Sequence, residues 1–191
     1  MQLTTTALTV PDGERMEYFD IIDYSGHEED PERLAGLLGY RKIFELGKDA
    51  LLVDAKDADS LARSGKKLII RDSSEKGLLI HALKNSAVIG ILANSNLDAD
   101  VMETVKSLRK LIILSASALT STNKHTRIAN LGKMRRVVRD CMHKKLKLAI
   151  SSFAGQKEYM LSSLQLVEIA KFAGADEETA RSMSGALGDF L

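Results

Sequence analysis

Two short apolar runs on either side of a long helical pattern constrain the fold of this chain more than any other feature. The runs are Leu111–Leu114 and Leu146–Ile150, and each is followed by serine. Apolar runs of this length, bounded by small polar residues, are typical of buried strands. Between the runs, apolar residues recur at helical spacing at Ile128, Leu131, Met134, Val138, Cys141 and Met142. Strand, helix and strand in this order predict a βαβ unit and therefore a parallel sheet.

The same alternation continues through the rest of the chain. We expect further strands at Tyr18–Asp23, Arg41–Leu46, Ala50–Asp54, Leu68–Ile70 and Ala87–Leu92. Helices are expected after the N-caps Asp30, Asp98 and either Ser162 or Ser163, and also at Asp57–Ser64, Leu78–Leu83 and Asp176–Leu187. About seven βα units with near-continuous apolar strands suit a parallel barrel or a doubly wound sheet. No GxGxxG or Walker loop follows a strand, so we expect a barrel-like α/β fold rather than a nucleotide-binding open sheet.

The predicted helix between the two runs is strongly basic. From Lys124 to Lys147 there are nine lysines and arginines and one acid, which gives a net charge of +8. The residues opposite its apolar face are Lys133, Arg136, Arg139 and His143. Most charged helix faces are merely solvated, but such faces usually mix signs, and a one-signed basic face is typical of a protein that binds a polyanion. Aromatic residues make up only 5% of the chain, so if it binds nucleic acid we expect contacts mainly to phosphates and shape, as in proteins on folded RNA, rather than base stacking.

Acidic residues are concentrated in the first third of the chain. Residues 1–60 contain fourteen acids and six bases, a net charge of −8, although the whole chain carries +1. An acidic region and a basic region suit a protein that places one surface on nucleic acid and another on a basic protein. Alternatively, charges that are separated in the sequence mix on the folded surface.

Patterns for catalysis or metal binding are weak. The four histidines form no HxH or HExxH cluster, and the chain contains no GxSxG motif. Asp20, Asp23 and His27, near a strand end, could hold a divalent ion, but loop and pre-helix roles suit Asp23 and His27 better. Turn and cap roles are expected for the serines at strand ends, which are Ser115, Ser117, Ser151 and Ser152.

The single cysteine, Cys141, excludes an intramolecular disulfide, and its place on the apolar helix face predicts a buried thiol. No apolar run is long enough to cross a bilayer, and the first residues do not resemble a signal peptide. We therefore expect a cytoplasmic protein without a membrane partner. Residues 1–15 are expected to form a lead-in, and residues 16–191 a single barrel-like domain.

Several stretches, in a consistent order, carry a resemblance to a known family. They are Phe19–Asp23 followed by Leu34–Tyr40, the Arg-x3-Leu-x3-Arg pattern of Arg127, Leu131 and Arg135, the run Ile150–Gly155, and the tail from Leu164 to Leu187. From about Met16 onward, the chain resembles protein component 3 of archaeal ribonuclease P, the thirty-kilodalton subunit family. It departs from that family at Leu114–Ala116, where Glu-hydrophobic-Asn is common, and near Met160, where the family carries an arginine.

This resemblance implies a TIM-like α/β barrel related to the PHP-type metal-dependent phosphoesterases but lacking their metal ligands. It also implies a non-catalytic subunit of an endoribonuclease whose RNA uses Mg²⁺ to remove the 5′ leader of precursor tRNA, while the protein itself binds no cofactor. The implied partners are the ribonuclease P RNA, whose catalytic domain the protein supports, and ribonuclease P protein component 2, in a heterodimer or heterotetramer. Contact with precursor tRNA would be indirect.

The residues expected to contact RNA are Lys42, Lys124, His125, Arg127, Lys133, Arg135, Arg136 and Arg139. Arg127 and Arg135 match family positions, and we expect them partly to brace the helix. An alternative function is a small barrel enzyme acting on a phosphorylated metabolite, with phosphate held at late strand ends by Ser151, Ser152 and Gly155. A third possibility is a barrel that binds only proteins.

Overall fold

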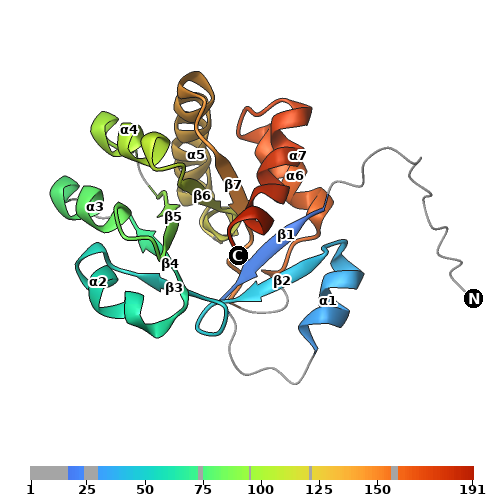
Figure 1. Ribbon diagram of the computed structural model, residues 1–191. Coiled ribbons are helices and arrows are strands. Elements are labelled where there is room, and N and C mark those ends of the chain that lie inside the picture. The colour runs from blue at the N-terminus through green and yellow to red at the C-terminus, as the bar shows by residue number, and fades with distance from the viewer. Residues whose placement is uncertain (1–16, 24–29, 73–74, 95, 121, 156–158) are drawn as a thin grey trace, which may run out of the picture.

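The computed structural model describes residues 17–23, 30–72, 75–94, 96–120, 122–155 and 159–191 (Figure 1). The predicted lead-in at residues 1–15 and His27 lie outside the described residues. Strands alternate with helices along most of the described chain; the exceptions are the strands Lys42–Glu45 and Ala50–Val53, which follow each other directly, and the last two helices.

Seven parallel strands form the centre of the molecule. They are β1 (Phe19–Ile22), β2 (Lys42–Glu45), β3 (Ala50–Val53), β4 (Lys67–Arg71), β5 (Val88–Leu92), β6 (Leu111–Ser115) and β7 (Leu148–Ser151). Their ladders make a two-stranded sheet, β1-β2, and a five-stranded sheet in the order β3-β4-β5-β6-β7. Each pair in both sheets is parallel. The predicted parallel α/β class is therefore confirmed.

The two sheets meet at both of their edges. Between β2 and β3, Leu46 forms a parallel bridge with Ala50, and the amide of Gly47 donates to the carbonyl of Ala50 at 2.7 Å. Between β7 and β1, the amide of Phe153 donates to the carbonyl of Ile21 at 2.9 Å. Within the described residues the ladders thus form two sheets, and the segment after β7 attaches to β1 outside a ladder.

Alternate residues of the strands point to two separate cores, because successive side chains of a strand face opposite sides. The inner core receives at least one side chain from every strand, including Ile21, Phe44, Ile69, Ile113 and Ala149. The outer core lies between the strands and the helices. The chain end closes the inner core, since Leu187, in the 3-10 turn η5 (Ala186–Asp189), packs among the strand residues. Figure 1 shows this end at the centre of the strands.

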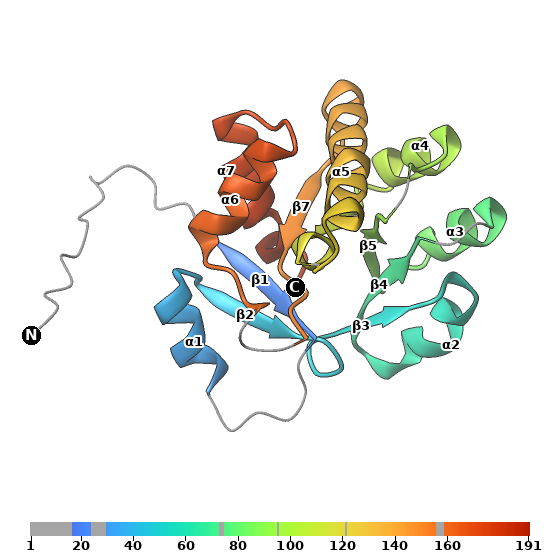
Figure 2. The ribbon, with the colours of Figure 1, turned by 180° about the vertical axis from the view of Figure 1, so that it is seen from behind.

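The helices surround the strands (Figures 1 and 2). They are α1 (Pro31–Leu38), α2 (Ala58–Leu61) between the 3-10 turns η1 (Ala55–Asp57) and η2 (Ala62–Ser64), α3 (Lys76–Leu83), α4 (Ala99–Ser107), α5 (Lys124–Lys144) after η3 (Ala116–Leu119), α6 (Ser163–Phe172) and α7 (Glu177–Gly185). Within the described residues, no helix combines the length and the apolar character that a membrane span requires.

Three of the predicted helix starts are correct in detail. The carboxylate of Asp30 accepts from the amide of Glu32 at 3.0 Å, with proline at the first helical position. Asp98 caps α4 in the same way. Of the two serines considered for α6, Ser162 is the cap, and it forms a reciprocal capping box with Gln165.

Candidate nucleic-acid interface

The long basic helix α5 begins and ends at well-defined caps. The side chain of Asn123 accepts from the amides of His125, at 2.9 Å, and Thr126, at 3.2 Å. Lys145, in the left-handed conformation, ends the helix. The thiol of Cys141 is buried in the packed face, and burial raises its pKa to about 12, which confirms the predicted buried thiol.

One predicted member of the packed face is wrong. Ile128 is 59% exposed, whereas Met134, Val137 and Val138 are buried. All residues from 124 to 129 are exposed, so the first turns of α5 extend past the part of the helix that packs on the strands. Periodicity identifies the face on which Ile128 lies, but it cannot tell how far along the helix the neighbouring layer reaches.

Seven of the eight predicted RNA-binding residues lie on α5, and all seven are exposed. They are Lys124, His125, Arg127, Lys133, Arg135, Arg136 and Arg139. The eighth, Lys42, is separate from them: it begins β2, where its ammonium lies 4.6 Å from the ring centroid of Phe44. In parallel strands all amino ends lie at one side, while α5 starts after the carboxyl end of β6, so Lys42 and the start of α5 are at opposite ends of the strands.

The arginines on α5 differ in how they are held. Arg135 Nε donates to the carbonyl oxygen of Phe172 at 3.0 Å, which ties α5 to the end of α6. Arg136 Nε donates to Asn96 Oδ1 at 3.3 Å, and Arg139 Nε to Asp140 Oδ1 at 3.2 Å. Lys133 forms no ion pair or hydrogen bond with any of the described residues. Arg135 therefore links α5 to α6, whereas the exposed Lys133 is not held by any described residue, and the contact of these residues with RNA stays a prediction.

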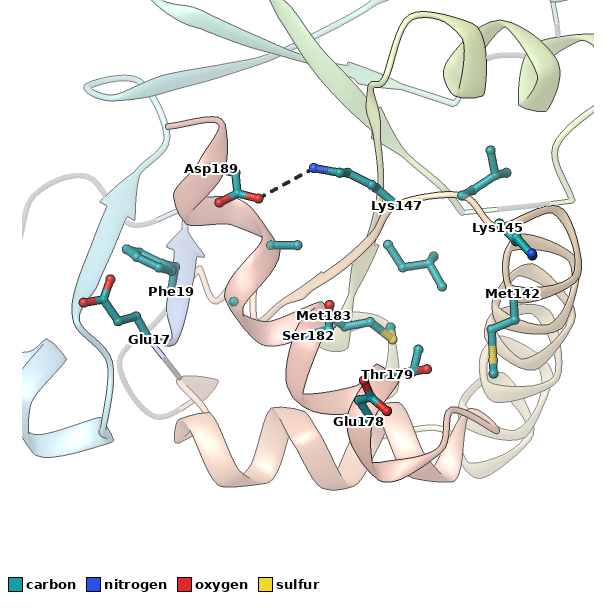
Figure 3. Close-up of a pocket in the computed structure, with 14 residues that line it drawn as sticks. Glu17, Phe19, Met142, Lys145, Lys147, Glu178, Thr179, Ser182, Met183 and Asp189 are labelled. Carbon is teal, nitrogen blue, oxygen red and sulfur yellow. Dashed lines mark ion pairs between the residues drawn. The ribbon is translucent and has the colours of Figure 1, made fainter. Parts of the chain in front are cut away.

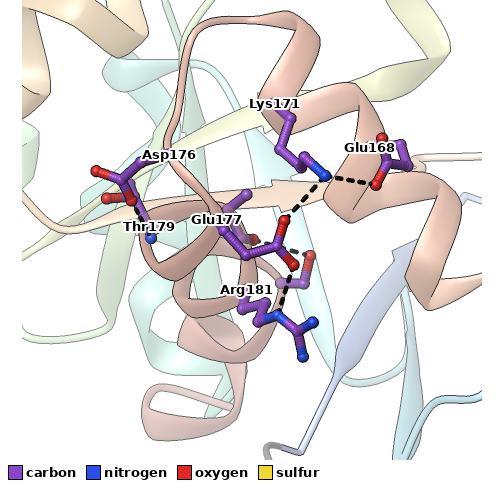
Figure 4. Close-up of polar contacts among 8 residues, drawn as sticks. Glu168, Lys171, Asp176, Glu177, Thr179 and Arg181 are labelled. Atoms are coloured by element: carbon purple, nitrogen blue, oxygen red, sulfur yellow. Dashed lines mark hydrogen bonds and ion pairs between the residues drawn. The ribbon is translucent and has the colours of Figure 1, made fainter.

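The surface of α6 and α7 has the mixed signs that α5 lacks. Glu177 pairs with Lys171 at 2.9 Å and with Arg181 at 2.8 Å, and Lys171 also pairs with Glu168 at 2.9 Å (Figure 4). Pairs this exposed add little stability, typically below about 1 kcal/mol. They show that cations on these helices are neutralised locally, whereas α5 contains one acid among its basic residues.

A cavity of about 840 Å³ lies at the amino ends of β1 and β7, beside α7 (Figure 3). Its charges are also mixed, because Lys145 and Lys147 face it together with Glu178 and Asp189, and Lys147 Nζ lies 3.7 Å from Asp189 Oδ2. This balance does not favour an anionic ligand, so the cavity is a weaker candidate than α5.

The carboxyl group of Asp20, which the sequence suggested only as a possible metal ligand, is buried and joins β1 to β7. Asp20 is fully buried, and its Oδ1 accepts from the hydroxyl of Ser151 at 2.6 Å and from the amide of Ser152 at 2.7 Å. The hydroxyl of Ser152 donates to Oδ2 at 2.5 Å. Burial raises the pKa of Asp20 to about 6, although these hydrogen bonds oppose the shift. The sequence feature that could have indicated this buried carboxyl group is an acid in the middle of an apolar strand pattern.

This arrangement corrects two interpretations of the sequence. Ser151 and Ser152 are not turn or cap residues, because their hydroxyls are bound to Asp20. Because both hydroxyls already donate to Asp20, they are poor donors for the phosphate of a metabolite. Ser115 does stand at the N-cap position of η3, but its side chain makes no capping hydrogen bond, and its hydroxyl lies 2.7 Å from that of Ser117 instead. Among the described residues, no three His, Cys, Asp or Glu side chains lie together as potential metal ligands.

Comparison with known proteins gives similarity of structure only. No family model and no curated protein matches the sequence. A chain in the cryo-EM structure of archaeal Ribonuclease P with mature tRNA matches with a TM-score of 0.67 at 13% identity, over 93% of this chain and 82% of that one. The crystal structure of A. niger ochratoxinase matches with a TM-score of 0.50 at 10% identity, over 88% of this chain and 52% of that one. At such identities the likeness shows a shared fold.

Proposed function

We propose that this chain is a protein subunit of ribonuclease P that binds and supports the RNA. The observation that carries the proposal is the exposed, one-signed basic surface of α5. The match to a chain of an archaeal ribonuclease P structure, which extends over most of both chains, supports it. A helix with one acid among its many cations suits RNA because each phosphate that a Lys or Arg side chain contacts releases condensed counterions.

The rigidity of α5 suits the same role. Its buried face packs on the strands, and the bond from Arg135 to the carbonyl of Phe172 holds its middle against α6. Charges on a rigid element keep their spacing. A mobile loop would lose side-chain and backbone entropy when it binds phosphates, and this loss would reduce its affinity more than that of a rigid helix. The exposed cations best placed for phosphates are Lys133, Arg136 and Arg139.

The proposal also assigns separate roles to the protein, the RNA and a partner protein. We propose that the seven strands form a TIM-like barrel in one domain over residues 16–191, that the RNA with Mg²⁺ performs the cleavage of precursor tRNA, and that ribonuclease P protein component 2 is the protein partner. The buried Asp20 carboxyl group, bound by the Ser152 hydroxyl, has no access to a substrate, and we therefore do not propose it as a catalytic group.

Reconstitution tests the proposal. Cleavage of precursor tRNA would be measured with the RNA and the partner proteins, with and without this chain, over a range of Mg²⁺ concentrations. We expect the chain to raise the rate at low Mg²⁺, because bound cationic side chains replace part of the metal ion atmosphere. Equal rates and equal Mg²⁺ dependence with and without the chain would overturn it.

A further inference from the structure

A small cavity opens beside the basic helix, at the carboxyl ends of β5 and β6. It has a volume of about 260 Å³ and lies between these strand ends and α5. Its apolar walls include Leu114, Met134 and Val137. Leu114 belongs to the outer core, so the cavity lies outside the ring of strands and apart from the Asp20 cluster. Crevices at the carboxyl ends of parallel strands are the usual ligand sites of α/β proteins.

One face of α5 supplies both the wall and the polar groups of this cavity. Asn130, Lys133, Met134 and Val137 all line it, and their spacing of three, four and seven residues places them on one side of a helix. Lys133 therefore borders the cavity as well as the outward basic surface. Arg136 does not line the cavity, but it lies three residues after Lys133 on α5, and its Nε donates to Asn96 in the β5–α4 connection that also supplies the lining residue Asn94.

The polar groups at the cavity are available to a ligand. Lys133 and Asn94 have no hydrogen-bond or ionic partner among the described residues. Asn130 uses its Nδ2 to donate to the carbonyl of Ala118 at 2.7 Å, which leaves its Oδ1 as an acceptor. The cavity thus offers a cation, an amide and a hydrogen-bond acceptor above apolar walls. These groups match a ligand that is flat and partly apolar, that carries donors and acceptors along its edge, and that is attached to an anion.

We propose that this cavity receives an unpaired base of an RNA, with the attached phosphate at Lys133 and Arg136. Whole small-molecule ligands usually occupy about 300–1,000 Å³, so a volume of about 260 Å³ suits a base better than a complete nucleotide. The remainder of the ligand must then lie outside, where the surface is the cationic face of α5. Proteins commonly recognise RNA by taking bases that are splayed out of a helix. The inference rests on the proposed RNA-binding function.

The test uses the full chain and two hairpin RNAs that differ in one bulged 2-aminopurine. Fluorescence of that base and equilibrium affinity would be measured for the natural protein, for Ala118→Leu, which fills the cavity, and for Ala129→Leu, which adds the same bulk at an exposed position of α5. We expect the natural protein and Ala129→Leu to prefer the bulged hairpin by roughly tenfold, and Ala118→Leu to lose that preference. Equal affinity for both hairpins, or a preference that survives in Ala118→Leu, would overturn the inference.

A second measurement covers a failure of Ala118→Leu to fold. The methyl resonance of Met134, at the cavity wall, is expected to shift when the bulged hairpin is added to the natural protein, while that of the distant, buried Met183 stays in place. No shift of Met134 would overturn the inference, as would an equal shift with adenosine monophosphate at the same concentration, which would indicate a metabolite site. If the chain stimulates cleavage of precursor tRNA but does not prefer the bulged hairpin, the proposed function stands and this inference fails. If the chain prefers the bulged hairpin but does not stimulate cleavage, this inference stands and the proposed function fails.

Discussion

At Asp20, side-chain hydrogen bonds connect β1 with β7 in place of part of a backbone ladder. Its carboxyl group accepts from both Ser151 and Ser152, which lie 131 and 132 positions later in the chain. A buried polar group is tolerated when its partners satisfy it, and here the partners are hydroxyls and an amide rather than a cation. Because no cation is among its hydrogen-bond partners in the described residues, desolvation dominates and the pKa of Asp20 is raised.

Asp20 should make stability depend on pH in an unusual direction. Because its pKa is raised from 3.8 to about 6 on folding, its contribution is complete below about pH 4 and is lost as pH rises through 6. The shift corresponds to roughly 3 kcal/mol. Asp20→Asn cannot titrate, and its amide can donate to the Ser152 hydroxyl. Between pH 4 and pH 7, urea unfolding should show that the free energy of unfolding of the natural protein falls by roughly 3 kcal/mol relative to that of Asp20→Asn. Parallel curves for the two proteins would contradict the assignment.

Gly90 marks the closest approach of β5 to β6. A Cβ atom at this position would lie 2.9 Å from the Leu111 Cβ and would strike the Leu111 carbonyl oxygen, a backbone atom that cannot move away. Gly90→Ala should therefore lower the free energy of unfolding by about 1–3 kcal/mol or more. Gly77→Ala is the matched control, because Gly77 lies in α3 with open space around it and should gain up to about 1 kcal/mol. Urea midpoints of the two variants should move in opposite directions.

At the scale of elements, α5 combines two functions on different faces. Its inward face, with Val138 and Cys141, packs against the strands, while its outward face carries cations that packing does not require. Charges of one sign on one helix repel each other and cost some stability, which α6 and α7 avoid by pairing. On α5 only Arg139 is paired with an acid of the same helix, Asp140, so a helix that bears most of this cost is expected to use its charge for binding.

Removal of three α5 cations tests this expectation. Replacement of Lys133, Arg136 and Arg139 with glutamine should lower the slope of log affinity for RNA against log salt by about two to three units, since each phosphate contact contributes roughly one. Folding should be unchanged, because all three side chains are exposed.

The control for this variant removes three cations from other helices. They are Lys76, Lys171 and Arg181, each of which is paired with an acid. The control should keep the slope of the natural protein. A normal slope in a folded variant of α5, or an equal loss in the control, would place the RNA surface elsewhere.

At the scale of the molecule, the inner core depends on segments from both halves of the chain. Strands from β1 to β7 each contribute to it, and Leu187 near the C-terminus fills its middle. Gly188 permits this approach, since a Cβ atom there would collide with the ring of Phe19. The fold therefore requires the last described turn as well as the first strand.

Leu187→Ala should consequently destabilise the whole molecule. Leu187 is fully buried, and truncation of a buried leucine costs about 2–5 kcal/mol. Leu164→Ala provides the comparison, because Leu164 is 67% exposed and its truncation should change stability by no more than about 0.5 kcal/mol. Thermal melting of both variants measures the difference. Equal melting temperatures would mean that the chain end is not part of the cooperative core.

The order and type of the elements were determined by the sequence alone. Runs such as Leu111–Leu114, caps such as Asp30 and Asp98, and the basic pattern of α5 are local signals, and the structure contains the elements that they predict. Local signals suffice here because strand or helix formation depends on the spacing of apolar residues and on end residues within one segment.

Only the tertiary structure decided which segments meet. The contact of Asp20 with Ser151, the separation of Lys42 from α5 and the exposure of Ile128 all depend on which strands are neighbours and how far each helix extends over them. Periodicity assigns a residue to a face of its own element but carries no information on what lies opposite that face. The small cavity beside Lys133 likewise exists because β5, β6 and α5 come together in space.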